Sequence, residues 1–456
     1  MERQFKEPKH GEFWVPGTSN DPIFGILGLR ENYFELRFGS RHRLKSDVIH
    51  GVLENGDKVT LWTRDFPQYS LSEHAPENFS EARSVSHILV GVHCDSKDEV
   101  FINKIAIGFD HLRAWLRMDE VISTSDERPD RQPFSIAAPY NIDSTLEITL
   151  GDRPVLESFA DSTGSYDAWG RFWGNNATIE ISSDRALCYS EWAKIEHSLM
   201  RLIAFNYGLK LPINLRNYFL SARDEPLDIF SISPMRPPAQ RGYISETELV
   251  IPGTEMPPEV TIDNWFRALS ELYPVPQILA GKEFQRNSIL ESNVLSAIAA
   301  LEKMHEHMGF AQERFPVEDF ELLRSRLVEL VSKDEQQSTL AIPSREWRDF
   351  LERAIGNRRS LRSKLKDLVR RLGKETFSNL GITPDEWINN VVEIRNRIAH
   401  TGSHVSEPSD NEAVRLRKLE GQTRAVLKLL LRVWMGLEVP NQKRLSLMFR
   451  PLFQKE

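Results

Sequence analysis

The chain changes its hydrophobic pattern once, and this change limits the folds it can adopt. Up to about residue 230, apolar residues come in short runs rich in Val and Ile, which are typical of strands. After residue 262 they recur every three or four residues, as on the buried face of a helix. Between the two parts lie prolines that exclude a long helix or a central strand: Pro234, Pro237, Pro238, Pro252, Pro257 and Pro258.

This pattern predicts an α+β protein with three parts. Residues 1–230 are expected to form a β-rich region of one or two subdomains. Residues 231–261 are expected to be a proline-rich junction. Residues 262–456 are expected to form an all-α helical bundle.

The β-rich part carries specific turn and strand signals. Asn55-Gly56 stands between two apolar runs in DVIHGVLENGDKVTLWT, which predicts a β-hairpin. Arg30-Glu31-Asn32 is expected to form a turn between IFGILGL and YFELRF. Further strands are predicted in ARSVSHILVGVHC, EVFINKIAIGF and NATIEISS.

Helical spacing also occurs inside the β-rich part, in residues 190–208. Ser190 is expected to cap the start of this helix and Gly208 to end it. After residue 262, six segments show helical periodicity: ESNVLSAIAALEKMHEHMG, VEDFELLRSRLVELVS, REWRDFLERA, LRSKLKDLVRRLG, DEWINNVVEIRNRIAH and LRKLEGQTRAVLKLLLRVWMGL. His305 and His307 are two positions apart on the first of these segments and are interpreted as surface residues.

The composition is that of an ordinary globular protein, and it indicates the cellular compartment in which the protein works. The formal net charge is −8, which provides no global basic field for nucleic acid. Two cysteines, Cys94 and Cys188, exclude a disulfide framework and fit a reducing compartment. No apolar signal core and no long uncharged run are present. We therefore expect a cytoplasmic protein with no membrane contact.

One segment is strongly basic although the chain as a whole is acidic. Residues 345–374 hold eleven Lys or Arg against four Asp or Glu, a local charge of +7. Such a surface attracts a phosphate backbone, although it is also typical of a solvated face around a leucine stripe. The cations that we expect to contact RNA, together with Arg397, are Arg358, Arg359, Arg362, Lys364, Arg370 and Arg371.

The stretch RNRIAHTG at residues 395–402 ends an amphipathic helix with a cluster of polar side chains. His400 lies five positions after Arg395, which is about 7.5 Å along a helix and about 140° around it. The two side chains are therefore not on one narrow stripe. They are interpreted either as a solvated helix end or as groups that handle a phosphate and a proton. An Arg–His spacing of this kind recurs elsewhere: Arg3–His10, Arg37–His42, Arg43–His50 and Arg397–His404.

R-N-R-I-A-H resembles the R-x4-6-H signature of HEPN ribonucleases, in which a polar residue often follows the Arg. SNVLSAIAALEKMHEHMG is similar to the start of the HEPN domain of ApeA-like anti-phage proteins. GEFWVPG, IFGILGL and IHGVLENGDKVTLWT, near the N-terminus, resemble the ApeA N-terminal domain. The resemblance touches both ends of the chain and is loose between about residues 110 and 260.

The resemblance implies a metal-independent endoribonuclease that needs no cofactor and acts in abortive infection. Its catalytic residues would be Arg395 and His400, with Asn396 orienting either group by a hydrogen bond. The partners implied are RNA, with tRNA as a plausible target, a second copy of the chain that completes a composite site, and a phage-derived trigger. A neutral His exchanges protons near pH 7, and an Arg binds phosphate oxygens, so both residue types suit this chemistry.

Other interpretations stay open on the sequence alone. A non-catalytic HEPN module would use Arg395 and His400 to hold a dimer interface. A carbohydrate-binding protein would use the aromatic stretch YDAWGRFWGNN, which is expected to be a loop, within the β-rich part. His87 and His93 would share one face of a strand, with Cys94 on the other, so no metal site is expected there.

Overall fold

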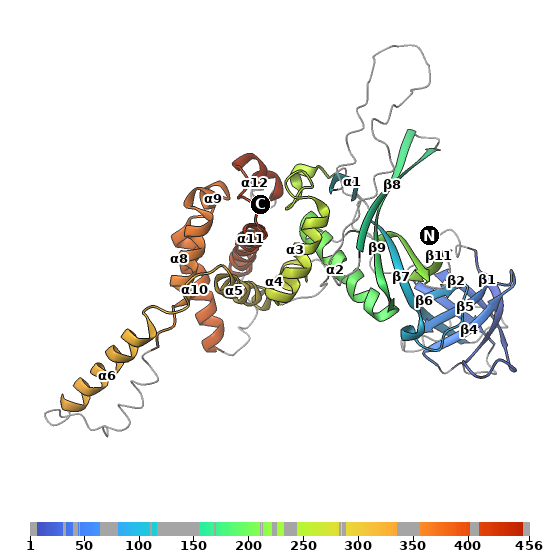
Figure 1. The fold of residues 1–456 in the computed structure, drawn as a ribbon, viewed down its shortest axis with the longest axis horizontal. Coiled ribbons are helices and arrows are strands. Elements are labelled where there is room, and N and C mark those ends of the chain that lie inside the picture. The colour runs from blue at the N-terminus through green and yellow to red at the C-terminus, as the bar shows by residue number, and fades with distance from the viewer. Residues whose placement is uncertain are drawn as a thin grey trace, which may run out of the picture. The chain divides into compact units, whose positions relative to one another are not determined.

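A computed structural model describes the following residues: 7–30, 33–39, 44, 46–63, 81–109, 112–115, 155–167, 170–209, 211, 213–220, 226–231, 244–281, 284, 289–334, 356–401 and 410–449. The chain divides into two compact units, residues 1–266 and 267–456. The first is β-rich and the second is mostly helical, which confirms the predicted α+β class (Figure 1). The junction predicted at 231–261 lies just before this division, and its role as a linker stays a prediction.

Six antiparallel strands open the first unit and close into a barrel. The strand order is β3-β2-β1-β4-β5-β6, and β3 also pairs with β6, which leaves no free edge. Apolar side chains fill its core, among them Phe13, Leu27, Leu36, Ile49 and Leu61. The strands are β1 (Lys9–Trp14), β2 (Ile23–Arg30), β3 (Tyr33–Phe38), β4 (Val48–Leu53), β5 (Lys58–Thr63) and β6 (Glu81–Val90).

The predicted hairpin is confirmed as β4–β5. Gly56 has a φ of +85°, the left-handed conformation that favours glycine, and Asn55 bonds the side chain and the backbone of Asp57. The other expected turn connects β2 to β3, which pair from Arg30 with Tyr33. Its residues 31 and 32 lie outside the described part of the chain.

Strands β1 and β4 approach each other closely because glycine lies at the contact. A Cβ atom placed on Gly51 would be 2.5 Å from Cδ1 and 2.7 Å from Cε1 of Phe13. Phe13 itself is 1% exposed in the barrel core. The ring therefore occupies the space that any side chain at position 51 needs.

We expect Gly51→Ala to destabilise the barrel by about 1–3 kcal/mol, because the added methyl group overpacks the core against Phe13. Amide hydrogen exchange in β1 and β4 measures this change. Gly28→Ala is the matched control, since its Cβ would meet only Pro8, at 3.6 Å or more. Equal protection in the two variants would contradict the predicted crowding.

A second antiparallel sheet continues from β6 in the order β6-β11-β10-β7-β9-β8. Helix α2 (Tyr189–Tyr207) packs on it, and the indole of Trp192 donates a hydrogen bond to the Ile102 carbonyl, 2.8 Å away. The remaining elements are β7 (Phe101–Phe109), β8 (Val155–Asp167), β9 (Gly170–Cys188), β10 (Ile213–Leu220), β11 (Pro226–Ser231), α1 (Leu112–Trp115) and the 3-10 turns η1 (Lys97–Glu99) and η2 (Glu246–Glu248).

Two local predictions for this region are wrong. The N-cap of α2 is Cys188, whose backbone amide donates to Glu191, while Ser190 lies within the first turn. The end of the helix at Gly208 is confirmed by its φ of +66°. The aromatic stretch 166–176 lies on β8 and β9, which pair up to Asp167 and Gly170, rather than in a long loop. Of this stretch, residues 168 and 169 lie outside the described part.

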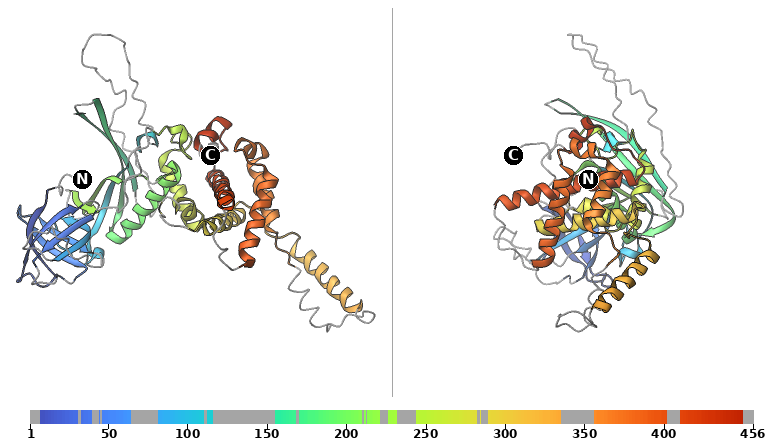
Figure 2. Two further views of the ribbon diagram at one scale, coloured as in Figure 1. Left: turned by 180° about the vertical axis from the view of Figure 1, so that it is seen from behind. Right: turned by 90° about the vertical axis from the view of Figure 1, so that its left-hand side faces the viewer.

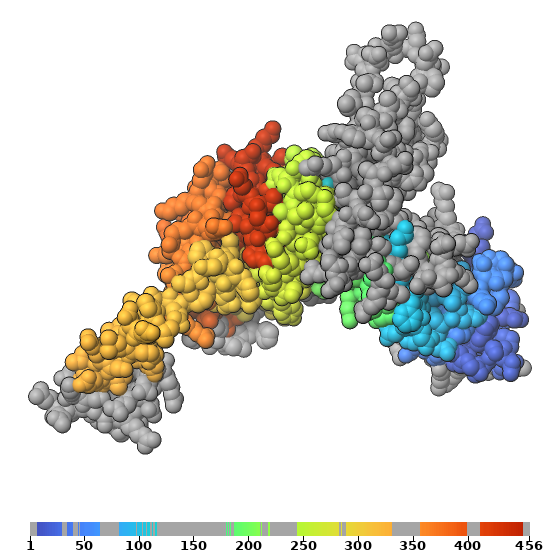
Figure 3. All heavy atoms as spheres, in the orientation of Figure 1, coloured from blue at the N-terminus to red at the C-terminus, as the bar shows by residue number. Residues whose placement is uncertain are grey.

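Helices build the second unit, with α5 packed against α11 and α10 beside α8 (Figures 1 and 2). Helix α6 extends away from the bundle (Figure 3). The elements are α4 (Val275–Gly281), α5 (Leu290–His307), α6 (Val317–Asp334), α8 (Leu361–Leu372), α9 (Lys374–Asn379), α10 (Pro384–Thr401), α11 (Asp410–Trp434) and α12 (Gln442–Met448), preceded by α3 (Pro258–Glu271), which spans the division.

Five of the six helical segments predicted after residue 262 are confirmed, as α5, α6, α8, α10 and α11. The sixth, REWRDFLERA, lies outside the described residues. Within the part of the chain that is described, no helix is both long enough and apolar enough to cross a membrane.

Candidate functional site

Helix α10 carries the RNRIAH motif and presents one apolar face to the bundle. Of the apolar residues predicted to share this face, Trp387, Val391 and Ile394 are each 1% exposed or less, whereas Ile398 is only half-buried. The Trp387 indole also donates to the Thr423 hydroxyl of α11, 3.3 Å away. Burial of this face fixes the rotation of the helix, and so decides which motif residues reach solvent.

Arg395 and Asn396, which follow the last of these buried residues, are exposed. The Arg395 Nη1 atom donates to the Asn396 side-chain oxygen at 3.5 Å, its only hydrogen bond or ion pair among the described residues. The guanidinium is therefore available to an anion. The backbone of His400 continues the helix, and its side chain lies outside the described part of the structure.

Two ion pairs join the motif half of α10 to the start of α11. Arg397 contacts Glu412 at 2.5 Å. One turn earlier, Arg415 donates to Glu393 at 2.9 Å and to Asn390 at 2.7 Å. The sequence did not indicate these partners, because residues 402–409 between the helices carry no pattern that fixes how α11 returns.

The cations expected to contact RNA differ in their availability. Arg358, Arg362 and Arg371 are exposed on or next to α8, and Arg362 reaches across to Asn389 of α10. Arg370 contacts Asp367 but keeps 74% of its side chain exposed. Arg359 and Lys364 are held inside the bundle, by Asp367 and Glu302 respectively. Contact of any of these residues with RNA stays a prediction.

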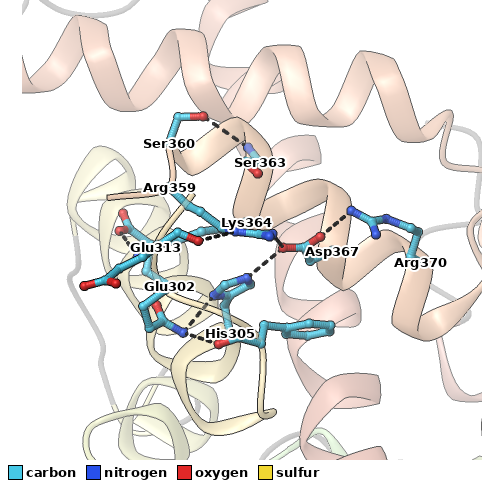
Figure 4. Close-up of polar contacts among 11 residues, drawn as sticks. Glu302, His305, Glu313, Arg359, Ser360, Ser363, Lys364, Asp367 and Arg370 are labelled. Carbon is cyan, nitrogen blue, oxygen red and sulfur yellow. Dashed lines mark hydrogen bonds and ion pairs between the residues drawn. The ribbon is translucent and has the colours of Figure 1, made fainter. Parts of the chain in front are cut away.

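A second polar cluster, centred on Asp367, is buried and joins α5 to α8 (Figure 4). His305 Nε2 lies 3.1 Å from Asp367 Oδ2, and their side chains are 0% and 3% exposed. Arg359 and Arg370 also contact the same carboxylate. The prediction that His305 is a surface residue is therefore wrong, because its buried partner lies 62 residues further along the chain.

The charge state of Asp367 follows from these contacts. Burial raises the pKa of its carboxyl group, but the hydrogen bond from His305 and the charges of Arg359 and Arg370 outweigh burial and lower the pKa overall. The carboxylate is thus ionised at neutral pH. Because the cluster excludes solvent around His305, we assign it to stability rather than to substrate chemistry.

The histidines considered for a metal site are separated. Strand β6 ends at Val90, so His93 does not share a strand face with His87. His93 instead stacks on His50, with ring centroids 4.7 Å apart, and its Nε2 lies 2.9 Å from the Gly51 carbonyl. Burial is the main cause that lowers the pKa of His93; the hydrogen bond with Gly51 opposes it, and the neighbouring His50 and Lys58 add smaller effects in the lowering direction.

The neighbouring Cys94 thiol is also buried. Burial raises the pKa of Cys94 to about 11, so the group is a neutral thiol near pH 7, whereas metals bind the thiolate. Among the residues that the structure describes, no group of three or more His, Cys, Asp or Glu side chains is placed to hold a metal ion.

Comparison with protein families matches both units. The model for ApeA N-terminal domain 1 matches residues 8–251, which is more than half of the chain. The chain belongs to the ApeA family. The Apea-like HEPN model matches residues 295–439, from α5 to α11, and so includes the whole of α10. No curated protein and no solved structure matches the chain. Membership of this family indicates an anti-phage HEPN nuclease.

We expect Asp367→Asn to lower the free energy of unfolding by about 3 kcal/mol at pH 7, as for other broken buried ion pairs. Because the pKa of Asp367 is lowered by folding, its stabilisation is full above the unfolded pKa of about 3.9 and is lost as the pH falls through the lower folded value. Urea unfolding of wild type and variant from pH 7 to pH 3 measures this difference.

The matched control is Asp385→Asn, an exposed carboxylate in the first turn of α10, where a loss of no more than about 1 kcal/mol is expected. A gap between wild type and Asp367→Asn that stays constant from pH 7 to pH 3 would show that the carboxylate charge is not responsible.

Proposed function

We propose that this protein is a metal-independent HEPN endoribonuclease that acts in anti-phage defence by abortive infection. The observation that carries the proposal is the position of Arg395 and Asn396. Both side chains are exposed near the end of a helix that is packed through Trp387, Val391 and Ile394, inside the region that matches the Apea-like HEPN model. A cation left open to solvent at this point is suited to bind a phosphate.

The chemistry proposed is attack of a ribose 2′-OH on the adjacent phosphorus. The O–P bond that forms closes a 2′,3′-cyclic phosphate, and the bond that breaks releases a 5′-OH. His400 exchanges the protons of the attacking and leaving oxygens. Arg395 stabilises the charge that develops on the phosphoryl oxygens, and Asn396 holds the Arg395 fork through the contact between their side chains.

The site is proposed to be completed by a second copy of the chain. On one helix, positions 395 and 400 point about 140° apart, so one protomer does not direct both side chains to a single phosphate. A symmetric dimer through the HEPN unit brings two copies of the motif together. Arg395 of one copy then acts with His400 of the other, or both copies share one substrate.

The RNA is proposed to follow the exposed cations of α8 towards the motif. Arg362 contacts Asn389, which precedes Arg395 by six residues, or about 9 Å along α10. Arg358 and Arg371 are exposed on the same segment. Structured host RNA such as tRNA is the proposed substrate. The β-rich unit is proposed to restrain the enzyme, in the cytoplasm, until a phage-derived trigger appears.

We expect wild-type protein to cut total bacterial RNA at discrete sites in the presence of EDTA, and His400→Ala to make no cuts. The new ends should be a cyclic phosphate and a 5′-OH, which end mapping by sequencing detects. Arg395→Ala should reduce the cleavage rate by about 100-fold or more, the size of effect seen when one charge-stabilising donor is removed.

Size-exclusion chromatography with light scattering is the control that tests whether His400→Ala keeps the size and oligomeric state of the wild type. If purified wild type is silent, the same pair is compared in cells during phage infection, where the trigger is present. Equal RNA profiles and equal protection with both proteins would mean that the HEPN unit is a binding or dimerisation module.

We expect the triple variant Arg358→Gln, Arg362→Gln, Arg371→Gln to bind RNA less tightly. Each lost phosphate contact should flatten the slope of log affinity against log salt by about 0.7 for a single strand. Filter binding in the His400→Ala background measures this without cleavage. Arg326→Gln, an exposed cation on α6, serves as control, and an unchanged salt slope in the triple variant would remove these residues from the RNA path.

A further inference from the structure

We propose that Arg397, paired with Glu412, is a positioning residue that fixes the last turn of α10 rather than a contact to RNA. This inference rests on the proposed function, because the turn that it fixes carries His400. It also reassigns Arg397, which the basic composition of the motif had grouped with the RNA-binding cations.

The contacts between α10 and α11 follow one antiparallel register. Trp387 meets Thr423, Glu393 meets Arg415, and Arg397 meets Glu412. As the residue number rises on α10 it falls on α11 by a similar amount, so the contacts form a continuous row along the two helices. Among the described residues, Arg397–Glu412 is the contact of this row nearest the end of α10.

The ion pair nearest the end of α10 is less exposed to solvent than the one before it. The side chains of Arg415 and Glu393 are 47% and 54% exposed, values at which an ion pair contributes little. The side chains of Arg397 and Glu412 are 34% and 26% exposed. The better-shielded charge pair thus lies nearest the end of the helix.

Helix geometry places position 400 next to position 397 on the helix surface. Residues three and four apart are neighbours on a helix surface, so position 400 adjoins positions 397 and 396. Position 395 lies about 160° around the helix from position 397. The ion pair therefore holds the side of α10 on which His400 is carried and leaves Arg395 on another side, towards solvent.

The end of α10 needs such an anchor. The last turn of a helix lacks backbone hydrogen-bond partners and frays readily. Helix α11 is itself fixed in the bundle, because Leu416 and Leu419 are buried and Arg424 donates hydrogen bonds to Glu420 and to the Ile278 carbonyl. Through its ion pair with Arg397, Glu412 ties the end of α10 to this fixed helix. A misplacement of a reacting group by about 1 Å costs about 100-fold in rate, so a small effect on position is sufficient.

The test is a charge swap. Glu412→Arg places two cations together and should lower kcat for RNA cleavage by about 10- to 100-fold, with KM within about twofold of wild type. The double variant Arg397→Glu with Glu412→Arg restores the pair in reverse and should recover kcat to within a few-fold. Lys418→Glu, an exposed charge reversal on α11, is the control and should behave as wild type.

Amide hydrogen exchange of residues 396–401 adds a measurement that does not depend on activity. Exchange there should rise at least about tenfold in Glu412→Arg and return towards wild type in the double variant. Recovery of protection supports the positioning role even if wild type shows no His400-dependent cleavage, a result that would count against the proposed function alone.

Two results would overturn the inference. A double variant that regains helix protection but keeps a raised KM and a low kcat would show that Arg397 contacts the RNA. Unchanged exchange in Glu412→Arg would show that the pair does not hold the helix end.

Discussion

Burial of the Asp367 carboxylate constrains how the helical unit can assemble. A charge with 3% of its side chain exposed requires partners, because an unpaired ion in a low-dielectric interior costs several kcal/mol. His305 supplies one partner from α5, and Arg359 supplies another from the segment before α8. That segment also pairs with residues at the base of α6, where Arg359 N–H donates to the Gln312 carbonyl. One carboxylate thus links α5, α8 and the point from which α6 departs.

Burial also determines which residues of α10 are available to a ligand. Its apolar side chains are buried or half-buried by packing, so among the described residues of the helix the exposed polar ones are those that can meet a substrate. The structure distinguishes further between the polar residues. Arg397 is committed to Glu412, whereas Arg395 has only Asn396 as a polar contact among the described residues. Two arginines two positions apart therefore have different chemistry available to them.

The sequence was sufficient where a local rule determines the structure. Alternation, Asn55-Gly56 and the period of the helical stripes predicted the hairpin, the class of each unit and most of the bundle, because turn residues and periodicity act over a few positions. The resemblance of both ends to one family was borne out by the family matches. The failures have a common cause. The sequence interpretation of His305, His93 and the stretch 166–176 used nearby residues, while their partners Asp367, Gly51 and β8 are set by tertiary contacts.

The motif itself shows why a signature locates a site more readily than it assigns roles. R-N-R-I-A-H identifies the helix and two residue types, but the motif does not specify which of its two arginines binds phosphate. Which arginine remains available depends on where α11 returns, and residues 402–409 give no local signal of that path. Glu412 becomes the partner of Arg397 only once α11 is packed through Leu416 and Leu419. The electrostatics of the candidate site are thus decided by a helix that does not carry the motif.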